Sequence, residues 1–291
     1  MASEVLPIAE GGRTMIPYIQ QPSLELGPIS IQAFGVLLAA AALIGLAIFR
    51  RRSTGAGLDR EVGSQLVGWV LIAGFLGAHL VDRLLYNLGE TLANPLSLLT
   101  PWEGISSYGG LLGGTVGALL FLRRHPQGEK NWRYLDAIAY ALPFGFIVGR
   151  LGCFLAFDHV GAPTDFFLGQ AYEDGIVRHN MGFEEALYWV GIAVAMAAFG
   201  RTARQPGLFV GLLAVLYAPG RFLLDFLRVS DERYAGLIIS QYASVVLFAI
   251  GLWVLWRVIR ARRHQADDSS NRSAVEQPGS SSSALSGGEK V

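Results

Sequence analysis

The sequence is poor in cysteine and has no excess of charge of either sign. Cys153 is the single cysteine among 291 residues, which excludes a disulfide within one chain and a metal site built from several cysteines. The 23 basic and 23 acidic residues give a formal net charge of zero, so no overall basic field favours nucleic acid as a partner. No spacing of histidines and carboxylates is typical of a metal site. We therefore expect neither a metal nor a cofactor.

The sequence also lacks a visible internal repeat and a recognisable cleavable signal peptide. Residues 1–28 are polar and mixed, without a basic segment that precedes an apolar core and a cleavage site. They are expected to form a periplasmic segment before one membrane domain at residues 29–263. Residues 264–291 are rich in Ser, Gly, Asp and Gln and poor in apolar side chains, which predicts a disordered cytoplasmic tail.

Apolar residues, in contrast, are abundant. Hydrophobic residues make up 52% of the chain, charged residues 16%, and the mean hydropathy is +0.40, values typical of a polytopic membrane protein. A helix needs about 20 residues to cross a hydrocarbon core of about 30 Å. The stretches that approach this length lie at residues 29–49, 66–86, 108–122, 135–157, 184–200, 207–225 and 237–259. The predicted fold class is an all-α membrane protein with seven transmembrane helices.

The charges of the loops predict the orientation of these spans. Basic residues follow the first, third, fifth and seventh spans, whereas the alternate loops carry mainly acidic residues. By the positive-inside rule, the amino terminus lies outside and the carboxyl terminus lies in the cytoplasm. The basic loops contain Arg50, Arg51, Arg52 and Arg60, then Arg123, Arg124, Lys130 and Arg133, then Arg201 and Arg204, and finally Arg257, Arg260, Arg262 and Arg263.

Arg150 lies inside an apolar run, in the outer half of the fourth predicted span. An arginine at membrane depth costs roughly 2.5 to 3.5 kcal/mol on insertion scales, so it normally faces a protein interior or a wet cavity and meets an anion there. Gly145, Gly149 and Gly152 remove side-chain bulk around it, which lets a ligand or helix approach. Two interpretations stay open: a ligand-binding arginine, or a simple buried ion pair.

The sixth predicted span carries a second group of charges. Arg221, Asp225 and Arg228 are four and seven residues apart and so share one helical face, after a break at Pro219 and Gly220. One interpretation is an ion pair between Arg221 and Asp225 that neutralises itself. The other is that Asp225 orients the guanidinium of Arg221 toward a phosphate. The region between the fourth and sixth spans is the candidate pocket.

Further polar residues stand at the ends of other spans. Tyr108 begins a glycine-rich segment, where it is expected to anchor the helix at the interface, to hydrogen-bond a lipid headgroup or to assist a proton transfer. Gly113 and Gly117 in the same segment are typical of tight helix packing. Glu184 and Glu185 precede the fifth span, and a capping or solvated role is favoured for them over catalysis.

These residues together resemble the prolipoprotein diacylglyceryl transferase family, from about Pro17 to Arg257. The central family pattern is Gly-Arg-x-Gly-Asn-Phe-x-Asn-x-Glu-x-x-Gly, and residues 149–161 read Gly-Arg-Leu-Gly-Cys-Phe-Leu-Ala-Phe-Asp-His-Val-Gly. Other matches are Leu-Gly-Pro at 26–28, Ser-Tyr-Gly-Gly at 107–110, Leu-Pro-Phe-Gly at 142–145, and Arg-Phe at 221–222 with Arg228. The departures are Phe34 for tyrosine, Tyr108 for histidine, Cys153 and Ala156 for asparagine, and Asp158 and Asp225 for glutamate.

The resemblance implies a multi-pass enzyme of the bacterial inner membrane with seven transmembrane helices. Such an enzyme moves the diacylglyceryl group of phosphatidylglycerol to the lipobox cysteine thiol of a prolipoprotein signal peptide and releases glycerol phosphate. The implied partners are therefore membrane lipid and a preprotein. Because the departures fall in the site, the alternative is a divergent paralogue that binds lipid or acts as an accessory membrane protein.

The resemblance also implies roles for individual residues. Arg150 and Arg221 are predicted to clamp the phosphate, and Asp158 and Asp225 to orient them. Tyr108 is the first candidate for the base that the thiol needs, and Asp158 is the second. The other residues predicted to line the substrate site are Gly161, which lets its loop approach lipid, Arg228, Phe34 and Cys153, whose expected role is that of a small packing thiol.

Overall fold

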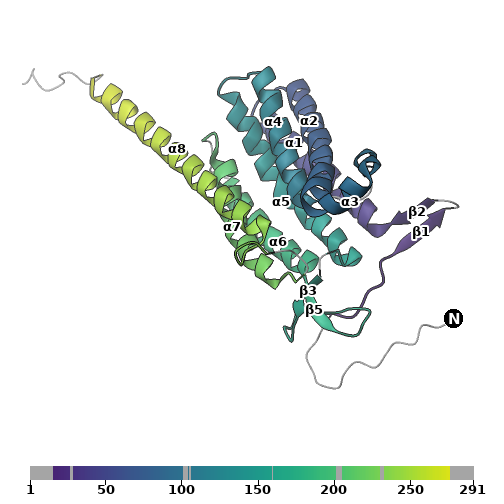
Figure 1. Cartoon of the computed structure of the whole chain (residues 1–291). Coiled ribbons are helices and arrows are strands. Elements are labelled where there is room, and N and C mark those ends of the chain that lie inside the picture. Colours follow the sequence, from purple (N-terminus) through teal and green to yellow (C-terminus); the bar gives the residue numbers. More distant parts are fainter. Residues whose placement is uncertain are drawn as a thin grey trace, which may run out of the picture.

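The computed structural model describes residues 16–26, 29–100, 104, 106–158, 160–200, 205–229 and 233–275. Most of these residues lie in helices, and small β-sheets lie near one end of the helical bundle (Figure 1). The helices are α1 (Ala33–Gly55), α2 (Arg60–Val81), α3 (Leu88–Ala93), α4 (Ser107–Arg124), α5 (Lys130–Ala156), α6 (Met181–Gly200), α7 (Leu208–Leu224) and α8 (Ile239–Val275). A π-helical turn, η1 (Asp82–Tyr86), extends α2, and 3-10 turns form η2 (Pro95–Leu99) and η3 (Asp225–Leu227).

Two antiparallel β-sheets complete the described part of the chain. Strands β1 (Ser23–Leu26) and β2 (Ile29–Gln32) form a hairpin that leads into α1. Strands β3 (Val160–Pro163), β4 (Gln170–Ala171) and β5 (Val177–Asn180) form a second sheet in the order β3-β5-β4, between α5 and α6. The all-α prediction is therefore right for the long apolar segments and incomplete for the connections.

Six helices in the described ranges are long and apolar enough to cross a membrane. They are Ala33–Gly55, Arg60–Tyr86, Lys130–Ala156, Met181–Gly200, Leu208–Leu227 and Ile239–His264. Large apolar side chains on their surfaces, such as Leu43, Ile72 and Val194, are about two thirds exposed, as lipid-facing side chains are. The prediction of a multi-pass membrane protein is confirmed. Helix α4, at the third predicted span, has 18 residues and is not among the six, because five glycines and two terminal arginines lower its hydropathy.

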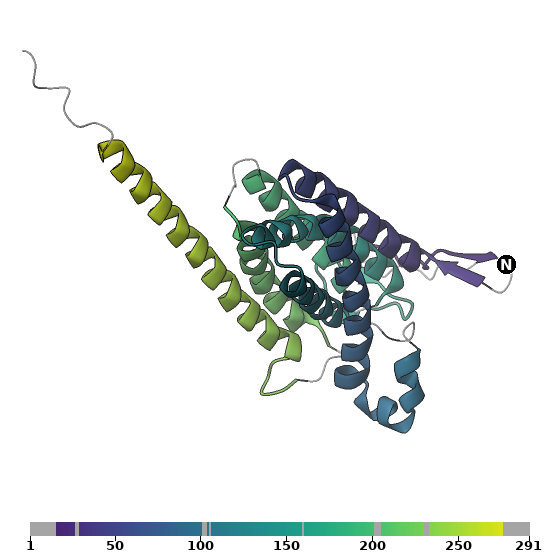
Figure 2. The ribbon, with the colours of Figure 1, turned by 90° about the horizontal axis from the view of Figure 1, so that it is seen from above.

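Two predicted boundaries are wrong. The first span was expected from residue 29, but residues 29–32 form β2, because Ile-Ser-Ile-Gln alternates apolar and polar side chains as a strand does. Helix α8 continues to Val275 and projects beyond the bundle (Figure 2), so the predicted disorder does not begin at residue 264. Gln265, Ala266, Arg272 and Ala274 are the strong helix formers in this segment, and the other residues continue the helix that the apolar part of α8 begins. Residues 1–15, 27–28, 201–204 and 276–291, on which other predictions fall, lie outside the described residues.

The helices bury two apolar clusters along the length of the bundle. One cluster joins α1, α2, α4 and α5 around Leu66, Phe121 and Tyr134. The other joins α5, α6 and α7 around Trp189 and Met196. Helix α5 contributes to both clusters, so it is the central helix that fixes the position of the charged residues described below.

Helices α2 and α4 pack through glycines, as the spacing of Gly113 and Gly117 predicts. A Cβ atom added at Gly113 would lie 2.9 Å from the Cα atom of Gly77, and one added at Gly117 would lie 2.6 Å from the Cβ atom of Ala73. These separations are too short for two carbon atoms, so a side chain there would push the helices apart.

We expect Gly113→Val to lower the thermal stability of the purified protein, because overpacking of this kind costs about 1 to 3 kcal/mol in the free energy of unfolding. The measurement is a thermal unfolding curve in detergent. Gly191→Val is the matched control, since nothing lies within 4 Å of a Cβ atom added there. Equal unfolding temperatures for the two variants would contradict the close packing.

Candidate functional site

Arg150 lies in the second half of α5 and is buried, with 3% of its surface exposed. Its Nε atom is 2.9 Å from Oε2 of Glu185, which lies on α6. One Nη atom lies 3.9 Å from Sγ of Cys153, one turn along α5. The anion that an arginine needs at membrane depth is thus a carboxylate from a neighbouring helix.

Arg221, on α7, meets the same carboxylate. It is 2% exposed, its Nη1 atom pairs with Oε1 of Glu185, and its Nη2 atom lies 3.0 Å from Oδ1 of Asp225. Glu185 itself is 2% exposed, with one oxygen on each arginine. Three helices therefore bring the two predicted arginines together around one shared acidic residue.

Asp225 is fully buried at the point where α7 gives way to the 3-10 turn η3. Besides Arg221, its carboxylate accepts a hydrogen bond from Oγ of Ser240 at 2.5 Å, and Nη1 of Arg228 lies 3.8 Å away. The predicted spacing on one helical face is confirmed for Arg221 and Asp225, whereas Arg228 follows the 3-10 turn with extended backbone and reaches Asp225 with its side chain. We call these three residues, with Arg150 and Glu185, the arginine cluster.

The arginine cluster holds three guanidinium groups and two carboxylates, so it carries one excess positive charge when all are ionised. Buried charges are tolerated only when they are paired and hydrogen-bonded. An excess of one cation suits the binding of an anion with several acceptor oxygens, and guanidinium groups present paired donors of the spacing that phosphate oxygens require.

Tyr108, at the start of α4, lies against Arg221. Nε of Arg221 donates to the Tyr108 hydroxyl at 3.3 Å, and the guanidinium carbon lies 5.2 Å from the centre of the tyrosine ring. The hydroxyl donates to the carbonyl oxygen of Ser240 at 3.2 Å, close to Oγ of Ser244. Tyr108 therefore helps to position Arg221. It donates its hydroxyl proton to a backbone carbonyl of α8.

The break predicted at Pro219 and Gly220 does not interrupt α7, which is continuous from Leu208 to Leu224, and a side chain that sequence reasoning missed packs there. Tyr188 of α6 donates its hydroxyl to the carbonyl oxygen of Leu216 and accepts from the backbone N–H of Gly220 at 3.2 Å. It satisfies backbone groups that the proline disturbs. The space beside Gly220 is thus occupied by protein.

Asp158 is not placed beside Arg150. Helix α5 ends at Ala156, and Phe157 adopts a left-handed backbone conformation with φ of 52°, which turns the chain before Asp158. The Asp158 side chain is consequently exposed. The carboxylate that orients Arg150 is Glu185, so the prediction that Asp158 orients this arginine is wrong for the described structure.

Gly161, Phe34 and Cys153 all lie around the arginine cluster. Gly161 is in β3, where its backbone bridges to Arg228 and an added Cβ atom would lie 2.6 Å from the Cβ atom of His179. The absence of a side chain at Gly161 therefore lets β3 approach β5. The space beside Gly161 is occupied by His179, where the sequence predicted lipid. Phe34 of α1 packs against the open face of Gly152, and Cys153 is buried beside Arg150.

Sequence reasoning missed the central residue, Glu185, by treating it as solvated together with Glu184. Consecutive residues on a helix point about 100° apart, so two adjacent carboxylates at the start of an apolar helix can meet different surroundings. That signal was present in the sequence. What the sequence could not tell is which of the two would face the arginines.

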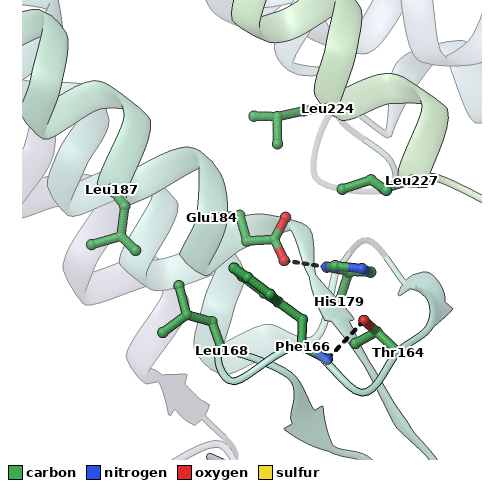
Figure 3. A pocket seen from close by; sticks show the side chains of 8 residues that line it. All are labelled: Thr164, Phe166, Leu168, His179, Glu184, Leu187, Leu224 and Leu227. Carbon is green, nitrogen blue, oxygen red and sulfur yellow. Dashed lines mark hydrogen bonds and ion pairs between the residues drawn. The ribbon is translucent and has the colours of Figure 1, made fainter.

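Figure 3 shows the side chains that line an open hollow of about 510 Å³, two of which, Glu184 and Leu224, directly precede Glu185 and Asp225 of the arginine cluster. The hollow lies between the start of α6, the end of α7 and the three-stranded sheet, whereas the predicted pocket was between the fourth and sixth spans. Its lining consists of Thr164, Phe166, Leu168, His179, Glu184, Leu187, Leu224 and Leu227. Nδ1 of His179 lies 2.5 Å from Oε1 of Glu184. In the described part of the chain no group of three or more metal-ligating side chains gathers.

Comparisons with known proteins agree with the resemblance seen in the sequence. The model of the family described as prolipoprotein diacylglyceryl transferase matches residues 21–257. Curated relatives named phosphatidylglycerol–prolipoprotein diacylglyceryl transferase include that of Tolumonas auensis, 33% identical over 251 residues that cover 82% of this chain and 96% of the relative. Those of Solidesulfovibrio magneticus and Thermosynechococcus vestitus are 30% and 29% identical, over 83% and 84% of this chain and 95% of each relative.

Proposed function

Since the chain belongs to the prolipoprotein diacylglyceryl transferase family, we propose that it transfers the diacylglyceryl group of phosphatidylglycerol to the lipobox cysteine thiol of a prolipoprotein, releasing glycerol phosphate. The observation that carries this proposal is the convergence of Arg150 and Arg221 on Glu185 in a buried site. The reaction makes a phosphate the leaving group, and a leaving phosphate gains negative charge in the transition state. Fixed guanidinium groups stabilise that charge without reorganising.

Arg150 and Arg221 are the proposed phosphate clamp, with Arg228 as a third cation at its edge. Glu185 and Asp225 orient the clamp before substrate arrives, since both already contact Arg221. The phosphate then supplies acceptor oxygens that offset the excess positive charge of the arginine cluster. Tyr108 is proposed to position Arg221 and not to act as the base, which was its predicted role.

We further propose that the protein has seven spans in the bacterial inner membrane, with its amino terminus outside and its carboxyl terminus in the cytoplasm. The loop charges support this orientation. Helix α4 is the proposed seventh span: its 18 residues measure about 27 Å, close to the hydrocarbon thickness, and it packs along α2. This topology places the arginine cluster, at the ends of α5 and α7, toward the outer leaflet.

The direct test is an assay of the purified protein in vesicles that contain labelled phosphatidylglycerol and a peptide with a lipobox cysteine. The expected product is a thioether between diacylglycerol and the peptide, detected by mass spectrometry. A folded, lipid-bound protein that forms no thioether would reject the transferase. It would favour the alternative, a paralogue that binds lipid, which the substitutions Phe34 and Cys153 in the family pattern support.

We expect Phe34→Tyr to raise turnover about fivefold, because a hydroxyl that makes one net hydrogen bond contributes about 1 kcal/mol. Phe34 lies on α1 against Gly152, two residues after Arg150 in α5. The measurement is the initial rate of thioether formation. Phe49→Tyr, in the apolar cluster at the other end of α1, is the control. A rate that does not rise would show that the lost hydroxyl does not limit this enzyme.

A further inference from the structure

The start of α6 carries two adjacent carboxylates that face different parts of the structure. Glu185 lies in the arginine cluster, whereas Glu184 lines the open hollow (Figure 3). Their Cα atoms are about 3.8 Å apart, as in any trans peptide. The hollow and the proposed phosphate clamp are therefore neighbouring compartments on either side of one helix end.

The end of α7 forms the second connection between the two compartments. Leu224 and Leu227 line the hollow, and Asp225 between them lies in the arginine cluster. Gly161 forms a third connection, since its backbone bridges to Arg228 and packs so closely against His179 that a side chain would not fit between them. Adjacent residues of three segments therefore line the hollow on one side and the arginine cluster on the other.

The hollow contains one ionisable pair in a wall that is otherwise Thr164, phenylalanine and leucine. His179 and Glu184 have side chains that are 15% and 9% exposed, and their contact of 2.5 Å joins Nδ1 to a carboxylate oxygen. An ionised carboxylate only accepts hydrogen bonds, so Nδ1 carries the proton and Nε2 is left as the acceptor nitrogen. A histidine held in this way by a carboxylate is arranged to take up a proton.

Among the described residues, the charged or titratable groups near His179 that have printed contacts bond to other partners than its ring. Arg178 pairs with Asp174 at 2.7 Å and lowers the pKa of that carboxyl to about 2. The Tyr172 hydroxyl donates to the backbone carbonyl of His179, at 3.5 Å, and not to its ring. Arg228 approaches from η3 through its backbone, while its side chain faces Asp225. Glu184 is thus the described ionisable side chain that contacts the imidazole.

We propose that His179, oriented by Glu184, is the general base that takes the proton from the acceptor thiol, an inference that rests on the proposed function. The S–H proton passes to Nε2 of His179. The sulfur forms a bond to the carbon of the diacylglyceryl group that carries the phosphate. The bond from that carbon to the phosphate oxygen breaks, and its electron pair leaves with glycerol phosphate. The imidazolium then returns its proton to the phosphate or to water.

The apolar lining identifies the kind of acceptor that the hollow takes. The aromatic and leucine side chains of the lining suit an apolar side chain next to the reacting cysteine, rather than a charged or highly polar segment; they are Phe166, Leu168, Leu187, Leu224 of α7 and Leu227 of η3. A peptide whose cysteine follows an apolar residue at the outer surface of the membrane has this character. The other candidates for the base fit less well, because Tyr108 donates its proton to Ser240 and Asp158 is exposed.

The test compares His179→Gln and Glu184→Gln with the wild type in the vesicle assay between pH 6.5 and pH 9. We expect His179→Gln to reduce turnover about 10²-fold to 10³-fold near pH 7, the usual contribution of a general base. The defect should shrink as the pH approaches the thiol pKa of about 8.5, where the acceptor ionises without help. Glu184→Gln should show a smaller loss in the same direction. Added imidazole should partly restore His179→Ala.

Several outcomes would overturn this assignment, and they are distinct from failure of the transferase itself. Wild-type turnover in His179→Gln rejects the base while leaving the transferase intact. A loss that is equal at every pH, without rescue by imidazole, shows a structural role. A wild type that forms no thioether removes the reaction and the base together. His125→Gln, at the exposed far end of α4, is the matched control and is expected to keep wild-type turnover.

Discussion

Arg150→Ala is expected to reduce thioether formation about 10³-fold, close to 4 kcal/mol of transition-state stabilisation, the magnitude lost with one preorganised donor in a catalytic site. The variant loses the guanidinium that Glu185 holds at 2.9 Å, and with it half of the proposed clamp. Arg150→Lys is expected to be intermediate, because an ammonium keeps the charge but cannot present two parallel donors to a phosphate. The measurement is the initial rate in phosphatidylglycerol vesicles.

Loss of folding is the competing explanation for a slow Arg150→Ala variant, because the substitution leaves Glu185 with one partner instead of two. Thermal unfolding of each variant separates the two effects. Arg178→Ala is the matched control, since this partly buried arginine also pairs with a carboxylate and lies outside the arginine cluster. A folded Arg150→Ala protein that turns over at the wild-type rate would remove Arg150 from the clamp.

The sequence predicted the features that depend on one residue and its surroundings. Arg150 and Arg221 could be assigned to a buried site because an arginine in an apolar span has few alternatives. The spacing of Gly113 and Gly117 predicted tight packing of α4, because only small residues allow helices to approach so closely. Both predictions are confirmed.

The features that depend on how elements rotate and turn could not be predicted. Glu185 and not Glu184 meets the arginines because of the rotation of α6 about its axis, which is set by packing against α5 and α7. Asp158 points away from Arg150 because Phe157 before it has a left-handed backbone conformation. This conformation is rare for phenylalanine, so the sequence does not predict it. The pairing of Gly161 with the backbone of Arg228 joins segments far apart in the sequence, which local pattern cannot reveal.

Glu185→Gln is expected to lower the free energy of unfolding by about 3 to 5 kcal/mol, the cost of removing one partner from a buried ion pair. Glu185 gives one oxygen to each arginine, so a neutral amide leaves two buried guanidinium groups facing each other. The measurement is chemical or thermal unfolding in a neutral detergent. Glu61→Gln, an exposed carboxylate at the start of α2, is the control and is expected to change stability little.

The same variant also distinguishes a phosphate clamp from a purely structural ion pair. If Arg150 and Arg221 bind a phosphate, phosphatidylglycerol supplies the negative charge that Glu185→Gln has lost, and it stabilises the folded state by mass action. The destabilisation of Glu185→Gln should therefore be smaller in micelles that contain phosphatidylglycerol than in micelles that contain phosphatidylcholine, whose headgroup carries no net charge. A structural ion pair predicts the same loss in both lipids, because neither lipid would then reach the arginines. Equal losses would remove the lipid phosphate from the arginine cluster.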